Sequence, residues 1–372
     1  MKILMLLTEL APGGAEKVVL ELARGFRRRH HDVAVVSLKP EPPEQRRAVP
    51  DGLQECGAEI FYLNLSGFRL WRLLRLFSIY RKFHPDVVHA HLMHPNLLSR
   101  FLKLFFQIPL VNTIHIAERR SGKNLFFLAD RLTRFLCDSY TAVSVAAARF
   151  QEDRCGLQPG SIRVIYNGSD PVEAAPKELM DSLRRDWNLD SCARIIGSVG
   201  RLDRQKGYDL FLNLLPRMEP FFPEGGTFGI VILGDGPERE KLLGLAEDVN
   251  RNHPRFRVVL PGYRRDAASL IGMFDVFVMP SRYEGYGLTL TEAFSAGVPA
   301  VCNSVDSLPE LCSLVPDHSF LVDFRKDEPE TIASVLLTAA QMPHFPGKTI
   351  MTTDAMCSAY LSCYASLLPS SR

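Results

Sequence analysis

Two glutamates flank a turn with two glycines in EGYGLTLTE, residues 284–292. The turn follows the apolar run MFDVFVMPS, which is typical of a buried strand. Helix-forming residues resume at Leu288 and continue to Ala296, so the turn should open a helix. Free backbone N–H groups and the helix dipole at such a start favour an anion, and a carboxylate one turn later suits ligand hydroxyls. The alternative is an ordinary strand–turn–helix corner with two solvated glutamates.

A second candidate loop, GRLDRQKG at 200–207, also follows an apolar strand. It presents Arg201 and Lys206 near the carboxyl end of that strand. A guanidinium fork and an ammonium point charge together suit a diphosphate. The alternative is two solvated surface charges.

Glycines and histidines mark three further strand ends. Gly13 and Gly14 in ELAPGGAEK allow a close backbone approach to a ligand at the start of the next helix, although the loop is neither G-x-G-x-x-G nor a P-loop. His115 ends the apolar run PLVNTIHI, where an imidazole can exchange a hydrogen bond with a substrate hydroxyl. His89 and His91 alternate at the end of another strand, and such histidines are usually structural.

Apolar runs alternate with helical patterns along the chain, and this alternation predicts α/β domains with parallel sheets. The first half gives runs at 2–8, 32–38, 86–92 and 109–116, and the alternation restarts at 194 with runs at 228–234, 256–262 and 274–281, each followed by a predicted helix. The domains expected are 1–170 and 171–354, with a last helix at 355–372 that can pack back on the first domain. Two doubly wound sheets that face each other would place a cleft between their carboxyl ends.

The composition is that of a globular protein, with 372 residues, 46% hydrophobic and 23% charged. Residues 1–165 are net basic and the remainder is net acidic. This asymmetry indicates an anionic partner for the first half, or else two domains of different surface charge with no partner implied. The eight cysteines form no C-x-x-C pair, and no apolar run reaches 18 residues. We therefore expect a cytoplasmic protein without a transmembrane helix.

Several segments in order resemble the retaining glycosyltransferases of family 4, which have the GT-B fold. They span roughly residues 3–340, and their combination is more specific than any one motif. The matching segments are GGAEKVVLELARGF, PDVVHAH, NTIHIAE, VIYNGSD, GRLDRQKGYDLFLNLLP, VILGDGPEREKL and LPGYRRDAASLIGMFDVFVMPSRYEGYGLTLTEAFSAGVPAV.

The resemblance implies a nucleotide-sugar donor and assigns roles to the candidate residues. Glu284 and Glu292 match the E-x7-E pair, so Glu292 would bind ribose hydroxyls and Glu284 would lie against the donor sugar. Arg201 and Lys206 match the pair that binds the diphosphate and stabilises its departure, and His115 matches the histidine near the reacting centre. The remaining donor-binding residues implied are Gly13, Gly14, Tyr263, Arg264, Gly285, Tyr286, Gly287, Leu288 and Thr289.

No Asp-x-Asp occurs in the chain, so no metal and no cofactor are expected. Retention would follow from attack on the face of the leaving group, with a phosphate oxygen taking the acceptor proton and without a covalent bond to Glu284. The chain departs from the family pattern after its last strand. In the family, Gly-Gly commonly precedes Pro-Glu there, and an Asn-Gly turn follows further on. This chain reads SVDSLPEL at the first place and has no later Asn-Gly.

The acceptor side is indicated by the basic and apolar segment GFRLWRLLRLFSIYRKF, 67–83, and by similar segments at 100–106 and 123–136. Such helices can rest on an anionic membrane surface at the inner face of the cytoplasmic membrane. The expected acceptor is then a glycan or a lipid-linked glycan in cell-surface polysaccharide or glycolipid synthesis. The alternative to a membrane contact is that Trp71, Leu74 and Phe77 are core residues and the arginines form a solvated face. A nucleic-acid partner is not expected because no recognition module surrounds the aromatic residues.

Two other functions fit the same fold. A nucleotide-sugar epimerase would need no acceptor, and a non-catalytic scaffold would keep the fold without the chemistry. The joint presence of His115, Arg201, Lys206, Glu284 and Glu292 favours a transferase.

Overall fold

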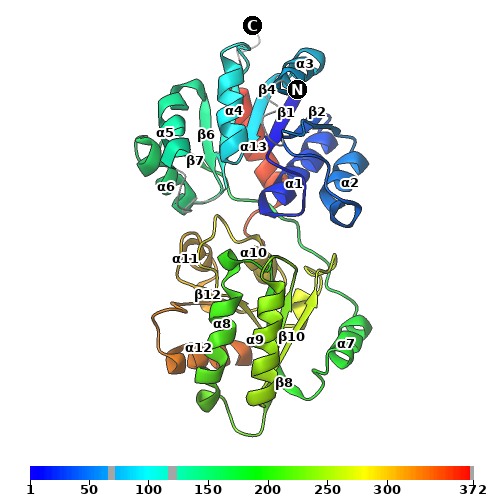
Figure 1. The fold of residues 1–372 in the computed structure, drawn as a ribbon, viewed down its shortest axis with the longest axis vertical. Helices are drawn as coiled ribbons and strands as arrows, with labels where there is room; N and C mark the ends of the chain where they lie inside the picture. The colour runs from blue at the N-terminus through cyan, green and yellow to red at the C-terminus, as the bar shows by residue number, and fades with distance from the viewer. Residues whose placement is uncertain (66–71, 116–123, 369–372) are drawn as a thin grey trace. The chain divides into compact units, whose positions relative to one another are not determined.

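The computed structural model describes residues 1–65, 72–115 and 124–368, and the chain divides into two compact units (Figure 1). Unit 1 contains Met1–Gly168 and Met351–Arg372, and unit 2 contains Ser169–Ile350. The sequence predicted these boundaries at 170/171 and 354/355, in each case a few residues after the boundary in the structure. Each unit is built on its own parallel sheet.

Unit 1 has a 7-stranded sheet with the order β3-β2-β1-β4-β5-β6-β7. All its strand pairs are parallel, and the central strands are buried on both faces. This burial explains why the central strands read as near-continuous apolar runs. The strands are β1 (Lys2–Leu7), β2 (Asp32–Ser37), β3 (Glu59–Tyr62), β4 (Val87–His91), β5 (Leu110–Ile114), β6 (Ser139–Ala142) and β7 (Arg163–Val164).

The helices of unit 1 include the last helix of the chain, α13 (Thr353–Leu367), which packs on α1 (Gly14–Arg28). Figure 1 shows α13 in red among the blue and cyan helices of this unit. A Cβ at Gly25 would lie 2.3 Å from Sγ of Cys357, so the two helices approach closely because residue 25 has no side chain. The other helices are α2 (Ala48–Glu55), α3 (Leu73–Phe83), α4 (Met93–Lys103), α5 (Asn124–Thr133) and α6 (Val145–Cys155).

Unit 2 has a 6-stranded parallel sheet with the order β10-β9-β8-β11-β12-β13. The strands are β8 (Cys192–Val199), β9 (Thr227–Leu233), β10 (Phe256–Gly262), β11 (Val276–Met279), β12 (Ala300–Asn303) and β13 (Ser319–Val322). The helices are α7 (Lys177–Asp186), α8 (Tyr208–Met218), α9 (Arg239–Asn252), α10 (Leu288–Ser295), α11 (Leu308–Cys312) and α12 (Pro329–Gln341).

Three local expectations need correction or limits. The α-helix predicted after β10 is wrong, because turns and the short 3-10 segment η6 (Ile271–Met273) connect β10 to β11. Ser269 Oγ bonds the carbonyl of Asp266, a local bond that competes with helix formation. The polar connection predicted over 171–192 contains the helix α7. The start of the helix predicted over 67–83 lies outside the described residues, which resume with α3.

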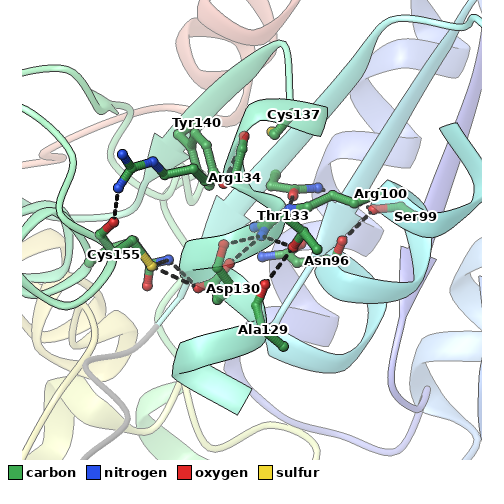
Figure 2. A network of polar contacts seen from close by, with 12 residues as sticks. Asn96, Ser99, Arg100, Ala129, Asp130, Thr133, Arg134, Cys137, Tyr140 and Cys155 are labelled. Carbon is green, nitrogen blue, oxygen red and sulfur yellow. Dashed lines mark hydrogen bonds and ion pairs between the residues drawn. The ribbon is translucent and has the colours of Figure 1, made fainter. Parts of the chain in front are cut away.

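A buried ion pair ties the helices of unit 1 to β5. Arg100 on α4 is fully buried, and its guanidinium pairs with Asp130 on α5 and donates 2.7 Å to Asn112 Oδ1 on β5. Figure 2 shows Asp130 between Arg100 and Cys155. Gln151 and Cys155 of α6 donate to the second carboxylate oxygen of Asp130. Four elements therefore share one network.

We predict that Arg100→Met lowers the free energy of unfolding by about 3–5 kcal/mol, because Asp130 would be left as an uncompensated buried charge. Urea denaturation measures this loss. The double variant Arg100→Met/Asp130→Leu should recover most of the loss, and Arg163→Met, at an exposed position, is the control. A double variant less stable than Arg100→Met would contradict this account.

Candidate active site

The two loops singled out in the sequence meet at one place in unit 2. In the strand order, β8 and β11 are neighbours. The chain continues from β8 to β9 toward one edge of the sheet and from β11 to β12 toward the other edge. Ligands of open parallel sheets bind beyond the carboxyl ends of the strands at such a switch point. The loop 200–207 follows β8 and the loop 280–287 follows β11, so both lie at this point.

Backbone contacts hold these two loops together. The N–H of Arg282 donates to Gln205 O at 2.7 Å, and Gln205 Nε2 donates to Tyr283 O at 3.1 Å. Gly207 has a φ of +69°, and a Cβ there would lie 2.1 Å from Pro280 O. Only glycine therefore fits both the conformation and the space at position 207.

Arg282 also fastens its loop to α8. Its guanidinium donates to both carboxylate oxygens of Asp209, at 2.7 and 2.9 Å. Burial by itself raises the pKa of Asp209, but the hydrogen bonds from Arg282 and Lys241 outweigh burial and lower that pKa to about 2. The loop is therefore held by a carboxylate that stays ionised across the physiological pH range.

The predicted residues Lys206 and Glu284 contact each other directly. Lys206 Nζ lies 2.6 Å from Glu284 Oε1, and Ser281 Oγ donates to the same oxygen at 2.8 Å. The side chains are 18% and 6% exposed, so the alternative of a solvated charge is wrong for Lys206 and for Glu284. The sequence analysis assigned Lys206 to the diphosphate and Glu284 to the donor sugar. It therefore did not predict the ion pair between them.

The helix α10 begins at the same point. Its N-cap, Gly287, has a φ of +101°, a conformation that side chains disfavour. Thr289 Oγ1 in the first turn is buried and has no hydrogen-bond partner among the described residues. Glu292 is 9% exposed, so the second glutamate is not solvated either. The first turn thus combines a buried hydroxyl with N–H groups that lack intrahelical acceptors.

The other predicted residues of unit 2 lie at the edge of this arrangement. Arg201 is half-exposed and pairs with Asp203. Tyr263 is 49% exposed, and Arg264 forms two hydrogen bonds with Asp266, at 2.9 and 2.7 Å. These two residues follow β10, which is two strands away from β8 in the sheet.

Sequence reasoning missed the residues that support the loop from β12. Asp306 Oδ2 accepts the N–H of Glu284 at 3.0 Å, and Ser307 Oγ donates to Tyr286 O at 2.9 Å. Asn303 Nδ2 donates to Ser281 O at 2.7 Å. Asp306, at a φ of +47°, and Ser307 stand directly before Leu-Pro-Glu, where the family pattern has Gly-Gly. The absence of Gly-Gly at this place was the sequence signal that could have pointed to Asp306 and Ser307.

In unit 1, Gly13 and Gly14 lie at the start of α1, beyond the end of β1. Both glycines are exposed, but Gly13 lies against Glu16, because a Cβ at Gly13 would be 2.3 Å from Glu16 Oε2. The Glu16 side chain is buried in the first turn of α1. An acidic side chain therefore already lies where the helix dipole favours negative charge.

Three histidines form a row at the carboxyl ends of β4 and β5. His91 Nδ1 lies 2.9 Å from His115 Nε2, and the rings of His89 and His91 have centroids 3.9 Å apart. His89 Nδ1 contacts the hydroxyl of Tyr364, and its Nε2 contacts Thr113 Oγ1, both at 2.6 Å. His89 is therefore structural, as expected, whereas His91 contacts the predicted site residue His115.

Burial keeps this histidine row neutral. It lowers the pKa of His89 and His91 well below the ordinary value, and the mutual repulsion of the charged rings adds to this effect. The pKa of His115 is lowered by burial to about 3. All three imidazoles are thus uncharged at neutral pH.

Taken together, two parallel-sheet units with candidate residues at their strand ends define a Rossmann-like architecture. The model of Glycosyltransferase Family 4 matches residues 12–173, and the model of Glycosyl transferases group 1 matches residues 193–341. The two matches together cover most of the chain. The chain belongs to glycosyltransferase family 4.

Individual relatives agree with this membership. A glycogen synthase of Mycobacterium tuberculosis is 27% identical over 362 residues, which cover 83% of this chain and 80% of the relative. The O-antigen biosynthesis glycosyltransferase WclY of Escherichia coli is 25% identical over 296 residues, which cover 76% of this chain and 79% of the relative.

A solved structure supports the fold. The crystal structure of Anabaena HepE in complex with UDP and glucose has a TM-score of 0.80 at 20% identity, with coverage of 99% of this chain and 100% of that chain. The fold of this chain is therefore GT-B, as the sequence predicted. None of the described helices is both long enough and apolar enough to cross a bilayer.

We predict that the protein loses stability as the pH falls below about 6.5. The unfolded chain takes up protons near that pH, whereas the folded histidine row resists them, so acid favours the unfolded state. Between pH 7.5 and 5, His115 alone should cost about 2 kcal/mol of unfolding free energy. Urea denaturation across this range checks the slope.

His115→Asn should reduce this pH dependence by about 2 kcal/mol between pH 7.5 and 5, and the contributions of His89 and His91 should remain. His30→Asn, which changes an exposed histidine, should keep the slope of the parent protein. Equal slopes for the parent and His115→Asn would show that the imidazole of His115 titrates normally in the folded state.

Proposed function

We propose that this chain is a retaining hexosyltransferase that moves a sugar from a UDP- or GDP-sugar to a glycan or lipid-linked acceptor. The observation that carries the proposal is the buried Lys206–Glu284 pair beside the start of α10, at the switch point of a parallel sheet. A cation, a carboxylate and a helix N-terminus at one strand end suit a diphosphate joined to a sugar. The first domain would then hold the acceptor and the second the donor.

In the proposed donor site, Lys206 and Arg201 bind the diphosphate, and the amides from Gly285 to Thr289 add hydrogen-bond donors. Lys206 has three N–H donors, so it can keep Glu284 while it meets phosphate oxygens. Glu292, one turn into α10, accepts hydrogen bonds from the ribose hydroxyls.

Other residues are proposed to bind the base and the sugar of the donor. Tyr263 and Arg264 lie where the base would bind, largely through their backbone. Gly13 and Gly14 are further proposed donor-binding residues, and roles beside the transferred sugar are proposed for Glu284 and for His115. In the solved HepE structure, UDP and glucose are the bound molecules. That complex supports a nucleotide-sugar donor here.

The proposed reaction places its charge at the diphosphate. The bond from the anomeric carbon to the phosphate oxygen breaks, and the acceptor oxygen bonds that carbon from the same face. The departing phosphate oxygen takes the proton of the acceptor hydroxyl, so the configuration is retained. Lys206, Arg201 and the N-terminus of α10 lower the barrier because negative charge grows where they already lie. Glu284 forms no covalent bond with the sugar, and its carboxylate remains paired with Lys206.

We predict that one nucleoside diphosphate, either UDP or GDP, raises the melting temperature by several degrees, because a ligand of the folded state stabilises it by mass action. Lys206→Met should lose most of the shift given by this nucleotide and by inorganic pyrophosphate. Glu292→Gln should keep the pyrophosphate shift and weaken that of the nucleotide, because only the ribose contact is lost. Thermal-shift titrations provide the measurement.

The control for these titrations is Lys326→Met, whose side chain is 83% exposed in unit 2. Full shifts in Lys206→Met would remove the diphosphate role of Lys206. A parent protein indifferent to every nucleotide would overturn the proposed donor class.

An anionic membrane at the cytoplasmic face is the proposed partner of unit 1. Large apolar side chains are exposed on α4, on the turn that directly follows α4, on α5 and on the 3-10 segment η3 (Arg134–Leu136). The elements α4, α5 and η3 contact one another. We call this set the apolar face. Its members are Phe101, Leu104, Phe105, Leu125, Phe126, Leu128, Leu132 and Phe135.

Positive charge accompanies the apolar face. Arg131 on α5 is exposed within it, and α3 contributes exposed Arg75, Arg81 and Lys82 beside the exposed Leu74. The ring centroids of Phe77 on α3 and Phe105 in the turn after α4 lie 5.2 Å apart, so α3 lies beside the end of α4. Apolar side chains beside basic ones suit a layer of anionic headgroups. A lipid-linked acceptor in polysaccharide or glycolipid synthesis would be reached at such a surface.

We predict that the protein cosediments with vesicles of phosphatidylglycerol and phosphatidylcholine, and that Leu125→Gln/Leu132→Gln weakens this binding about tenfold or more. These leucines are 75% and 63% exposed, so the change removes apolar surface without disturbing a core. Leu321→Gln, at an exposed leucine of unit 2, is the matched control. Unchanged vesicle binding in the double variant would argue against the apolar face.

A further inference from the structure

We propose that His91 is a positioning residue that fixes His115 in the tautomer with its proton on Nδ1. This inference rests on the proposed place of His115 near the reacting sugar. His91 lies at the last position of β4, His115 follows β5, and the two rings share one hydrogen bond of 2.9 Å.

The contact by itself allows two arrangements. In the first, His91 carries its proton on Nδ1 and donates to the bare Nε2 of His115. In the second, His115 carries its proton on Nε2 and donates to the bare Nδ1 of His91. Since both imidazoles are neutral, each ring has one N–H, and the choice for one ring decides the other.

The surroundings of His91 favour the first arrangement. His91 is fully buried, and its Nε2 has no hydrogen-bond partner among the described residues. The second arrangement would put the proton on this nitrogen and bury an N–H without an acceptor. Orphaned buried N–H groups are rarer in proteins than acceptors with unused lone pairs. The proton of His91 therefore belongs on Nδ1.

The neighbouring ring holds His91 in place. Both nitrogens of His89 are engaged, one by Tyr364 of α13 and one by Thr113 of β5, so His89 cannot serve Nε2 of His91. The His89 ring lies against that of His91 at an interplanar angle of 40°. Tyr360 of α13 packs on His89 with ring centroids 4.9 Å apart. The last helix of the chain thus supports the orientation of His91 through His89.

The consequence for the site is a defined donor. With Nε2 of His115 occupied as an acceptor, its proton lies on Nδ1, which can then donate to a sugar or acceptor oxygen. Burial keeps the pair from charging at neutral pH, so this N–H is present in every folded molecule. A histidine in the other tautomer would present a lone pair at Nδ1 instead.

The test uses the full chain with 15N-labelled histidine and long-range proton–nitrogen correlation spectra, which distinguish the two neutral tautomers. The signals of His115 are assigned by their loss in His115→Gln. The parent protein should show His115 protonated on Nδ1. A parent spectrum with the proton on Nε2 would overturn the proposal without any variant.

Two variants of similar size separate hydrogen bonding from packing. His91→Asn keeps an N–H donor near the position of Nδ1, whereas His91→Leu has none. His91→Asn should keep the tautomer of His115 and stay within about threefold of the parent kcat. His91→Leu should release the tautomer and lower kcat at least tenfold, with little change in the donor KM. Identical tautomers and kinetics in both variants would refute the positioning role.

The failure of the proposed function has a different signature. If His115→Gln turns over sugar donor at the parental rate, His115 has no role near the reacting centre. The tautomer in the spectrum of the parent protein would still decide whether His91 donates to His115.

Discussion

The Glu284 carboxylate is almost inaccessible to water, and a carboxylate in that position has to be paired. Lys206 supplies the charge from the loop after β8, and Ser281 supplies a hydrogen bond from the loop after β11. The pair can form only if these two strands are adjacent and if both loops turn over the same edge of the sheet. The strand order, the glycine at 207 and the fork between Arg282 and Asp209 all serve that geometry.

In unit 1, buried polar side chains on both faces of β5 likewise have to be paired. On one face, Asn112 accepts a hydrogen bond from Arg100, which is buried and paired with Asp130. On the other, Thr113 bonds His89 beneath α13, and the histidine row ends at His115. The strand is therefore fixed by polar networks from helices on either side. Such networks favour one arrangement, because a packing that separates these partners leaves further buried polar groups unpaired.

The apolar face has a different physical origin. The side chains of Leu125, Leu128 and Leu132 recur along α5 at spacings that keep them on the solvent side of the helix, while Phe127 and Asp130 point inward. A helix that is apolar on both sides is unusual for a surface element. The same stretch of sequence thus carries a core contact and a candidate membrane contact.

The sequence by itself determined the repeating strand–helix order, the parallel sheets and the segments at the strand ends, because hydrophobic periodicity and glycine positions are local signals. It also pointed to Glu284, Glu292, Arg201 and Lys206 as a group through their family pattern. Only the tertiary structure decided that Lys206 pairs with Glu284, that Asp306 and Ser307 support the loop, and that His91 contacts His115. These contacts join residues 21 to 78 positions apart, and the side chains meet because of strand order and register, which no local pattern encodes.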